Sequence, residues 1–165
     1  MRNNAVKAVA LGGMLAAVAL IIMCLGGLIP LATFICPLLA TLTGFLVYRF
    51  TGKQTAWCWY IVVAIFSLLL SSDKEAAAVF LFLGYYPILK SAFDKLRLGC
   101  VFKLCFFNAS IFVIYFLLLN IIGIAELADE YALLGIWGSA IMIVLGNITF
   151  FMLDKLLSIL AKKLG

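Results

Sequence analysis

Long apolar runs separated by short charged gaps dominate this chain, and the charge of the gaps alternates along it. Eleven of the 12 lysines and arginines lie at the N-terminus or after the second, fourth and sixth runs: Arg2, Lys7, Arg49, Lys53, Lys90, Lys95, Arg97, Lys103, Lys155, Lys162 and Lys163. The other gaps hold Lys74 and five of the seven acidic residues. Short cytoplasmic loops retain Lys and Arg, so the pattern predicts six spans with both termini in the cytoplasm.

The composition requires lipid as the main solvent of the side chains. Hydrophobic residues make up 67% of the 165 residues, charged residues only 12%, and the mean hydropathy is +1.27. No soluble core of this size needs so much apolar surface. We therefore expect one all-α integral domain over residues 1–165 in the cell membrane. The N-terminus is similar to a signal peptide, but its removal would reverse the charge pattern, so we expect a retained first helix.

Six membrane spans and two amphipathic cytoplasmic segments are expected. The spans are 5–24, 31–48, 55–70, 76–89, 102–122 and 131–153, and the amphipathic segments are 91–98 and 154–164. The fourth span has about fourteen apolar residues, or ~21 Å against a hydrocarbon core of ~30 Å, and Gly84 and Pro87 interrupt it. The C-terminal segment either lies in the interface or docks on a partner; a simple basic anchor is the alternative.

The first span carries small residues at helical spacing. Ala8, Gly12 and Ala16 recur every four residues, and Gly13 and Ala17 form a second row beside them. Helices in lipid associate through close approach at such residues. The row predicts either packing against another span of this chain or docking to another membrane subunit.

Three asparagines lie within the last two expected spans. Placing a side-chain amide in hydrocarbon without a hydrogen-bond partner costs several kcal/mol of free energy. We therefore expect a polar seam between these two helices, formed by Asn108, Asn120 and Asn147. One interpretation is an interhelical hydrogen bond. The other is a ligand cavity lined partly by Asn120, with Trp137 at a similar depth.

The sequence offers little for catalysis or for ion-driven transport. No charged residue lies in the middle of an expected span, the chain has no histidine, and its five cysteines form no CxxC motif. Proton-coupled carriers and metal sites usually need such groups, and no hydrolase motif is present. We expect no enzymatic activity, no cofactor and no metal site. The net charge of +5 is expected to face lipid headgroups and not nucleic acid.

The two acidic gaps would face the outside in this topology. Residues 71–75 (SSDKE) and 123–131 (GIAELADEY) together carry five acidic residues and Lys74. Such a surface could attract a cationic solute, and Lys74 could meet a carboxylate. Alternatively, the acids simply keep the outer loops solvated.

The segment 8–19 (AVALGGMLAAVA), together with six spans in about 165 residues, resembles the substrate-binding S component of energy-coupling-factor (ECF) vitamin transporters. The resemblance implies uptake of a small, vitamin-like solute, with Ala8, Gly12 and Ala16 contacting a transmembrane coupling subunit and separate ATPases supplying energy. It also implies a solute site near the outer face. By depth and polarity, the candidate contacts there are Lys74, Glu75, Asn120, Glu126, Tyr131 and Trp137. A non-catalytic scaffold subunit of the cell envelope is the alternative function.

Overall fold

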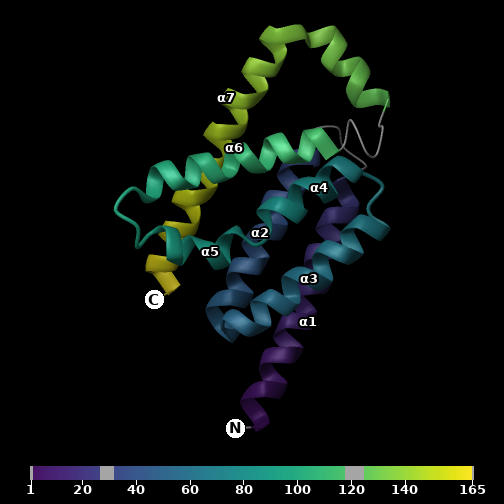
Figure 1. Ribbon diagram of the computed structural model, residues 1–165. Helices are drawn as coiled ribbons and strands as arrows, with labels where there is room; N and C mark the ends of the chain where they lie inside the picture. The colour runs from purple at the N-terminus through teal and green to yellow at the C-terminus, as the bar shows by residue number, and fades with distance from the viewer. Residues whose placement is uncertain (1, 27–31, 118–124, 165) are drawn as a thin grey trace. The chain divides into compact units, whose positions relative to one another are not determined.

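The computed structural model describes residues 2–26, 32–117 and 125–164, and all secondary structure in these ranges is helical (Figure 1). The helices are α1 (Arg2–Leu25), α2 (Ala32–Thr51), α3 (Lys53–Leu70), α4 (Lys74–Leu83), α5 (Tyr86–Phe93), α6 (Gly99–Leu117) and α7 (Ala125–Leu164). The chain forms two compact units, Met1–Leu96 and Arg97–Gly165.

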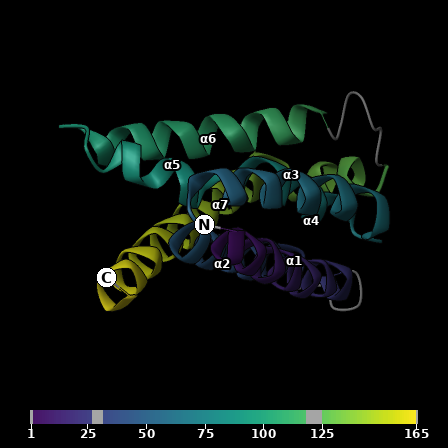
Figure 2. The ribbon, with the colours of Figure 1, turned by 90° about the horizontal axis from the view of Figure 1, so that it is seen from below.

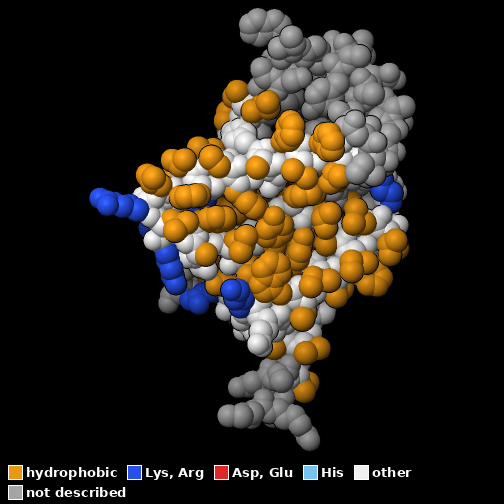
Figure 3. All heavy atoms as spheres, viewed as in Figure 1, with side chains coloured by type: hydrophobic (Ala, Val, Ile, Leu, Met, Phe, Trp, Pro, Cys, Tyr) orange, Lys and Arg blue, Asp and Glu red, His pale blue; other side chains and the backbone are white. Residues whose placement is uncertain are grey.

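Three helical segments of the described chain are long and apolar enough to cross a membrane. They are Val6–Leu25, Lys53–Leu70 and Lys74–Phe93, and shorter apolar helices cover Ile35–Thr51 and Gly99–Ile114. Hydrophobic side chains also predominate on the described surface seen in Figure 3. Apolar surface of this extent suits lipid and not water. The all-helical fold and the membrane character expected from composition are therefore found in the structure.

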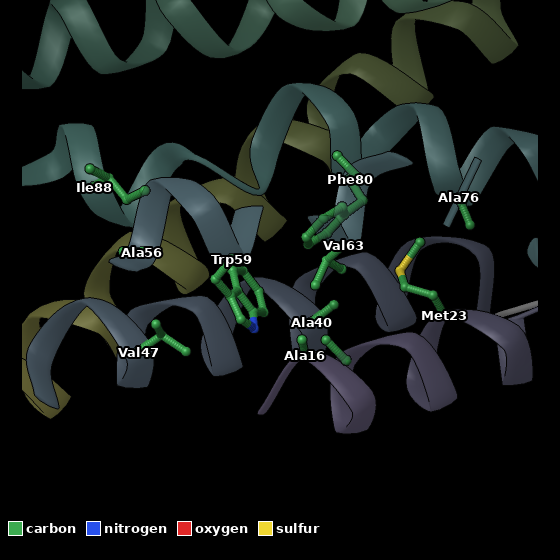
Figure 4. Packing of buried hydrophobic residues seen from close by; sticks show 12 residues of the cluster. Ala16, Met23, Ala40, Val47, Ala56, Trp59, Val63, Ala76, Phe80 and Ile88 are labelled. Carbon is green, nitrogen blue, oxygen red and sulfur yellow. The ribbon is translucent and has the colours of Figure 1, made fainter. Parts of the chain in front are cut away.

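Small residues allow the helices of the first unit to approach closely. Helix α1 lies beside α2 (Figure 2) and also contacts α3. Ala16, Ala40 and Ala56 contribute to a buried cluster with Trp59 and other apolar residues (Figure 4). The ring of Trp59 lies so near Gly44 of α2 that a Cβ there would come within 2.5 Å of Cζ3. Packing of this kind is the main source of helix association in lipid.

The fourth expected span is two helices, α4 and α5, separated at residues 84 and 85. Gly84 ends α4 with its N–H donating to the carbonyl of Phe80 at 2.6 Å. A Cβ at Gly84 would lie 2.7 Å from that same oxygen, so only glycine fits without a shift. Pro87 follows in the first turn of α5, where its missing N–H costs no helical hydrogen bond. The amphipathic segment expected at 91–98 differs too, because α5 ends at Phe93.

The second unit contains α6 and α7, which pack against each other. Helix α7 has 40 residues, or about 60 Å of helix at 1.5 Å per residue, roughly twice the thickness of a hydrocarbon core. Figure 1 shows that it bends along its length. The span expected at 131–153 and the amphipathic segment expected at 154–164 are thus parts of one helix.

Candidate functional site

The turn between α3 and α4 uses its polar side chains to cap helix ends. The Lys74 ammonium group donates to the carbonyl oxygens of Leu68, at 2.9 Å, and Ser71, at 3.0 Å. Asp73 accepts a 2.9 Å hydrogen bond from the N–H of Ala76 and so caps α4. The last carbonyls of a helix have no hydrogen-bond partners within the helix. A cation beside them also interacts favourably with the negative end of the helix dipole. The structure therefore gives Lys74 a structural task at the predicted solute entrance.

The same turn ties the end of α1 to α3. The Ser71 hydroxyl is buried and lies 3.3 Å from the carbonyl oxygen of Met23 and 3.0 Å from that of Asp73. Glu75 follows in the first turn of α4, where a carboxylate is favoured by the positive end of the helix dipole. Of the six residues predicted to contact a solute, Lys74 and Glu75 are the two whose side chains the structure describes.

The other four predicted contacts lie beyond the described side chains. Asn120 falls outside the described residues. Glu126, Tyr131 and Trp137 lie in the first half of α7, where the backbone is described but their side chains are not. These four assignments stay predictions.

An asparagine pair joins α6 to α7. Each amide nitrogen, of Asn108 and of Asn147, donates to the other side-chain oxygen at 3.0 Å. The second hydrogens bond within the helices, from Asn108 to the carbonyl of Leu104 at 2.9 Å and from Asn147 to that of Ile143 at 2.8 Å. Both amides therefore use all their N–H donors. This confirms the simpler interpretation for Asn108 and Asn147, an interhelical hydrogen bond, although Asn108 is exposed and Asn147 only half-buried, and the pair is not interior-facing.

Two further contacts lie along the same α6–α7 interface. The rings of Phe107 and Phe150 are stacked with their centroids 4.6 Å apart. Lys103 and Asp154 form an ion pair with a nitrogen–oxygen distance of 3.1 Å, and both side chains are largely buried. The sequence placed these two charges on the same membrane side but did not pair them. Together the three contacts fix the register of the two helices.

The predicted docking row of α1 faces the inside of the first unit. Ala16 is 8% exposed and belongs to the buried cluster, and Ala8 is half-buried. A Cβ added to Gly12 would lie 3.3 Å from Cγ2 of Thr55 in α3. This geometry supports the within-chain alternative for the row. The neighbouring row differs, because Ala17 is exposed and a Cβ on Gly13 would meet nothing within 4 Å.

An aromatic group surrounds the break between α4 and α5. The rings of Trp57 and Tyr85 are nearly parallel, with centroids 6.2 Å apart. Tyr60 stands edge-on to both, at 5.9 Å from Trp57 and 5.4 Å from Tyr85. Its hydroxyl donates to the carbonyl of Leu81 in α4. None of these three aromatic residues is a candidate contact from the sequence, although Gly84 and Pro87 mark the break beside Tyr85.

Comparisons with known proteins return nothing for this chain: no protein-family model, no curated protein and no solved structure matches it. The described side chains themselves offer hydrogen bonding at two helix interfaces and a cluster of aromatic rings at a broken helix. These groups can bind a molecule or hold helices together.

Proposed function

We propose that this chain is a membrane-embedded substrate-binding subunit for uptake of a small, vitamin-like solute, similar to the S component of ECF transporters. In this proposal it crosses the cell membrane six times with both termini in the cytoplasm. A separate coupling subunit and ATPases would supply energy, because no charged residue lies in the middle of an expected span to carry a coupling proton or ion.

The observation that supports a binding role most strongly is the broken element α4–α5. Of the three segments able to span a membrane, Lys74–Phe93 is the most enclosed: 56% of an apolar stretch of 18 residues is buried there, against 17% and 28% in Val6–Leu25 and Lys53–Leu70. Membrane transporters commonly build their solute sites at discontinuous helices, where backbone groups are released from the helical ladder. Here the break is bordered by Trp57, Tyr60 and Tyr85, whose rings could contact an organic solute. In the expected topology these residues lie nearer the cytoplasmic gaps than the outer ones, so this candidate site differs from the outer-face contacts that the resemblance implies.

The coupling subunit would contact α1 in this proposal. Gly12 and Ala16 are engaged inside the unit, whereas Gly13 and Ala17 lie on the exposed side of the helix. Small residues on an exposed side permit close approach of another helix. The exposed row is therefore the better place for a coupling subunit than the row that contains Ala8.

The alternative, a scaffold subunit without a solute, is favoured by the dense packing of α4. Five consecutive residues of this helix, from Ala76 to Phe80, are all buried. A scaffold would need this rigidity and the exposed side of α1, but no room for a ligand.

Native mass spectrometry of protein purified from its own host distinguishes the two functions. The binding subunit is expected to retain a small molecule, which is released on unfolding and retained less by a Tyr85→Ala variant. Phe112→Ala, at an exposed position of α6, is the matched control. A clean apo mass with copurifying envelope proteins would contradict the binding role and support the scaffold.

A further inference from the structure

The last three turns of α7 carry a net positive surface. Asp154, the acidic residue of segment 154–164, is paired with Lys103 at 3.1 Å and its side chain is only 19% exposed. The hydroxyl of Ser158 donates to the carbonyl of Asp154 at 2.8 Å and so stays on its own helix. The other charged residues of the segment are Lys155, Lys162 and Lys163, which are all exposed. The accessible charge is therefore provided by lysine.

Large apolar side chains are exposed on the same side as these lysines. Met152, Leu156 and Ile159 are exposed by 68%, 41% and 45% and follow one another at helical spacing. Lys163 continues their row, and Lys155 and Lys162 lie along one edge of it. Helical spacing alone would group Leu153, Leu156 and Leu157 on one side of this segment, but Leu153 and Leu157 are buried. The structure thus divides these leucines between an inner side and an exposed side.

The exposed row continues toward the middle of α7 at Ile148, which is 51% exposed. Ile148 lies one turn before Met152, within the span predicted at 131–153. An apolar surface of a spanning helix faces acyl chains, and the same row reaches the lysines without interruption. Aliphatic side chains at the acyl boundary with ammonium groups extending to the headgroups are typical of an interfacial helix. This continuity favours lipid over an acidic protein as the occupant.

We propose that residues 152–163 of α7 form a binding surface for anionic phospholipid headgroups in the leaflet nearest the C-terminus. The phosphate and its negative headgroup contact Lys155, Lys162 and Lys163, and the acyl chains cover Met152, Leu156 and Ile159. Anionic lipid is required because the three cations have no acidic residue left to neutralise them in this segment. This surface is independent of whether the chain binds a solute.

Native mass spectrometry of the full chain, titrated with phosphatidylglycerol or with phosphatidylcholine, tests the proposal. The wild-type protein is expected to prefer phosphatidylglycerol. Replacing the three lysines together (K155Q, K162Q and K163Q) is expected to weaken phosphatidylglycerol binding by about tenfold to a hundredfold. The corresponding Lys→Arg triple variant keeps the charge and is expected to retain the preference. Because all three positions are exposed, both triple variants are expected to fold with the same yield as the wild type.

A charge-matched control separates a defined surface from diffuse attraction. Lys53, Lys95 and Arg97 are exposed elsewhere, and their joint replacement by Gln removes the same charge. This control is expected to retain phosphatidylglycerol binding. Equal loss in both Gln triples, or equal binding of the two lipids by the wild type, would overturn the proposal. So would a copurifying acidic protein whose binding depends on the three lysines while lipid preference does not.

Discussion

At the scale of single residues, Lys74 has a role that its place in the sequence does not reveal. The charge pattern predicted its membrane side, and its acidic neighbours suggested a solute entrance. The structure instead directs its ammonium group to the carbonyls of Leu68 and Ser71. The direction of a flexible side chain depends on where α3 ends and α4 begins, and charge patterning does not determine this.

Replacing Lys74 with Met is expected to lower the free energy of unfolding by about 1 kcal/mol, because the carbonyls of Leu68 and Ser71 lose their donor. Reversible unfolding in mixed micelles measures the change. Lys53→Met, at an exposed lysine that begins α3, should change stability much less. Unchanged stability together with weaker solute retention would instead make Lys74 a solute contact.

At the scale of elements, the sequence predicted helix ends better than helix faces. The predicted first and third spans, 5–24 and 55–70, lie within α1 and α3, because charges and turns mark their ends. The outward side of α1 could not be chosen, since small residues occur all around it. Gly84 and Pro87 signalled an interruption of the fourth span, but the stacking of Trp57 on Tyr85 joins residues far apart in the chain and has no local signal.

The two neighbouring glycines of α1 allow a matched test of docking. Gly13→Leu is expected to leave the unfolding free energy nearly unchanged, since its Cβ meets nothing within 4 Å, and to abolish copurification of a coupling subunit. Gly12→Leu would press on Thr55 and is expected to cost about 1–3 kcal/mol of stability. Normal partner association of the Gly13→Leu protein would contradict docking through this side of α1.

The asparagine seam is tested by a double-mutant cycle on the unfolding free energy. Asn108→Leu is expected to cost about 0.6 kcal/mol, the average for polar contacts between membrane helices. Adding Asn147→Leu should then cost less than it does alone, because its partner is already absent. Strictly additive losses would show that the two amides do not stabilise each other.

At the scale of the whole molecule, composition alone predicted a helical chain built for lipid. The length and apolar character of Val6–Leu25, Lys53–Leu70 and Lys74–Phe93 agree with this prediction. Hydropathy records how apolar a segment is but not whether its backbone stays continuous, so α4–α5 and the 40-residue α7 differ from the expected spans. Long-range pairings such as Lys103 with Asp154 likewise need the packed helices.

In the proposed function the chain crosses the membrane six times with both termini in the cytoplasm, which places the acidic gaps outside and the basic gaps inside. This topology is tested by inserting, at single positions, a reporter whose signal depends on the side of the membrane. A reporter at Ser72 is expected outside the cytoplasm, and reporters at Gly52, at Arg97 and at the C-terminus are expected inside. A reporter at Ser72 on the same side as one at Arg97 would mean that α4–α5 does not cross the membrane, and would contradict the six-span topology.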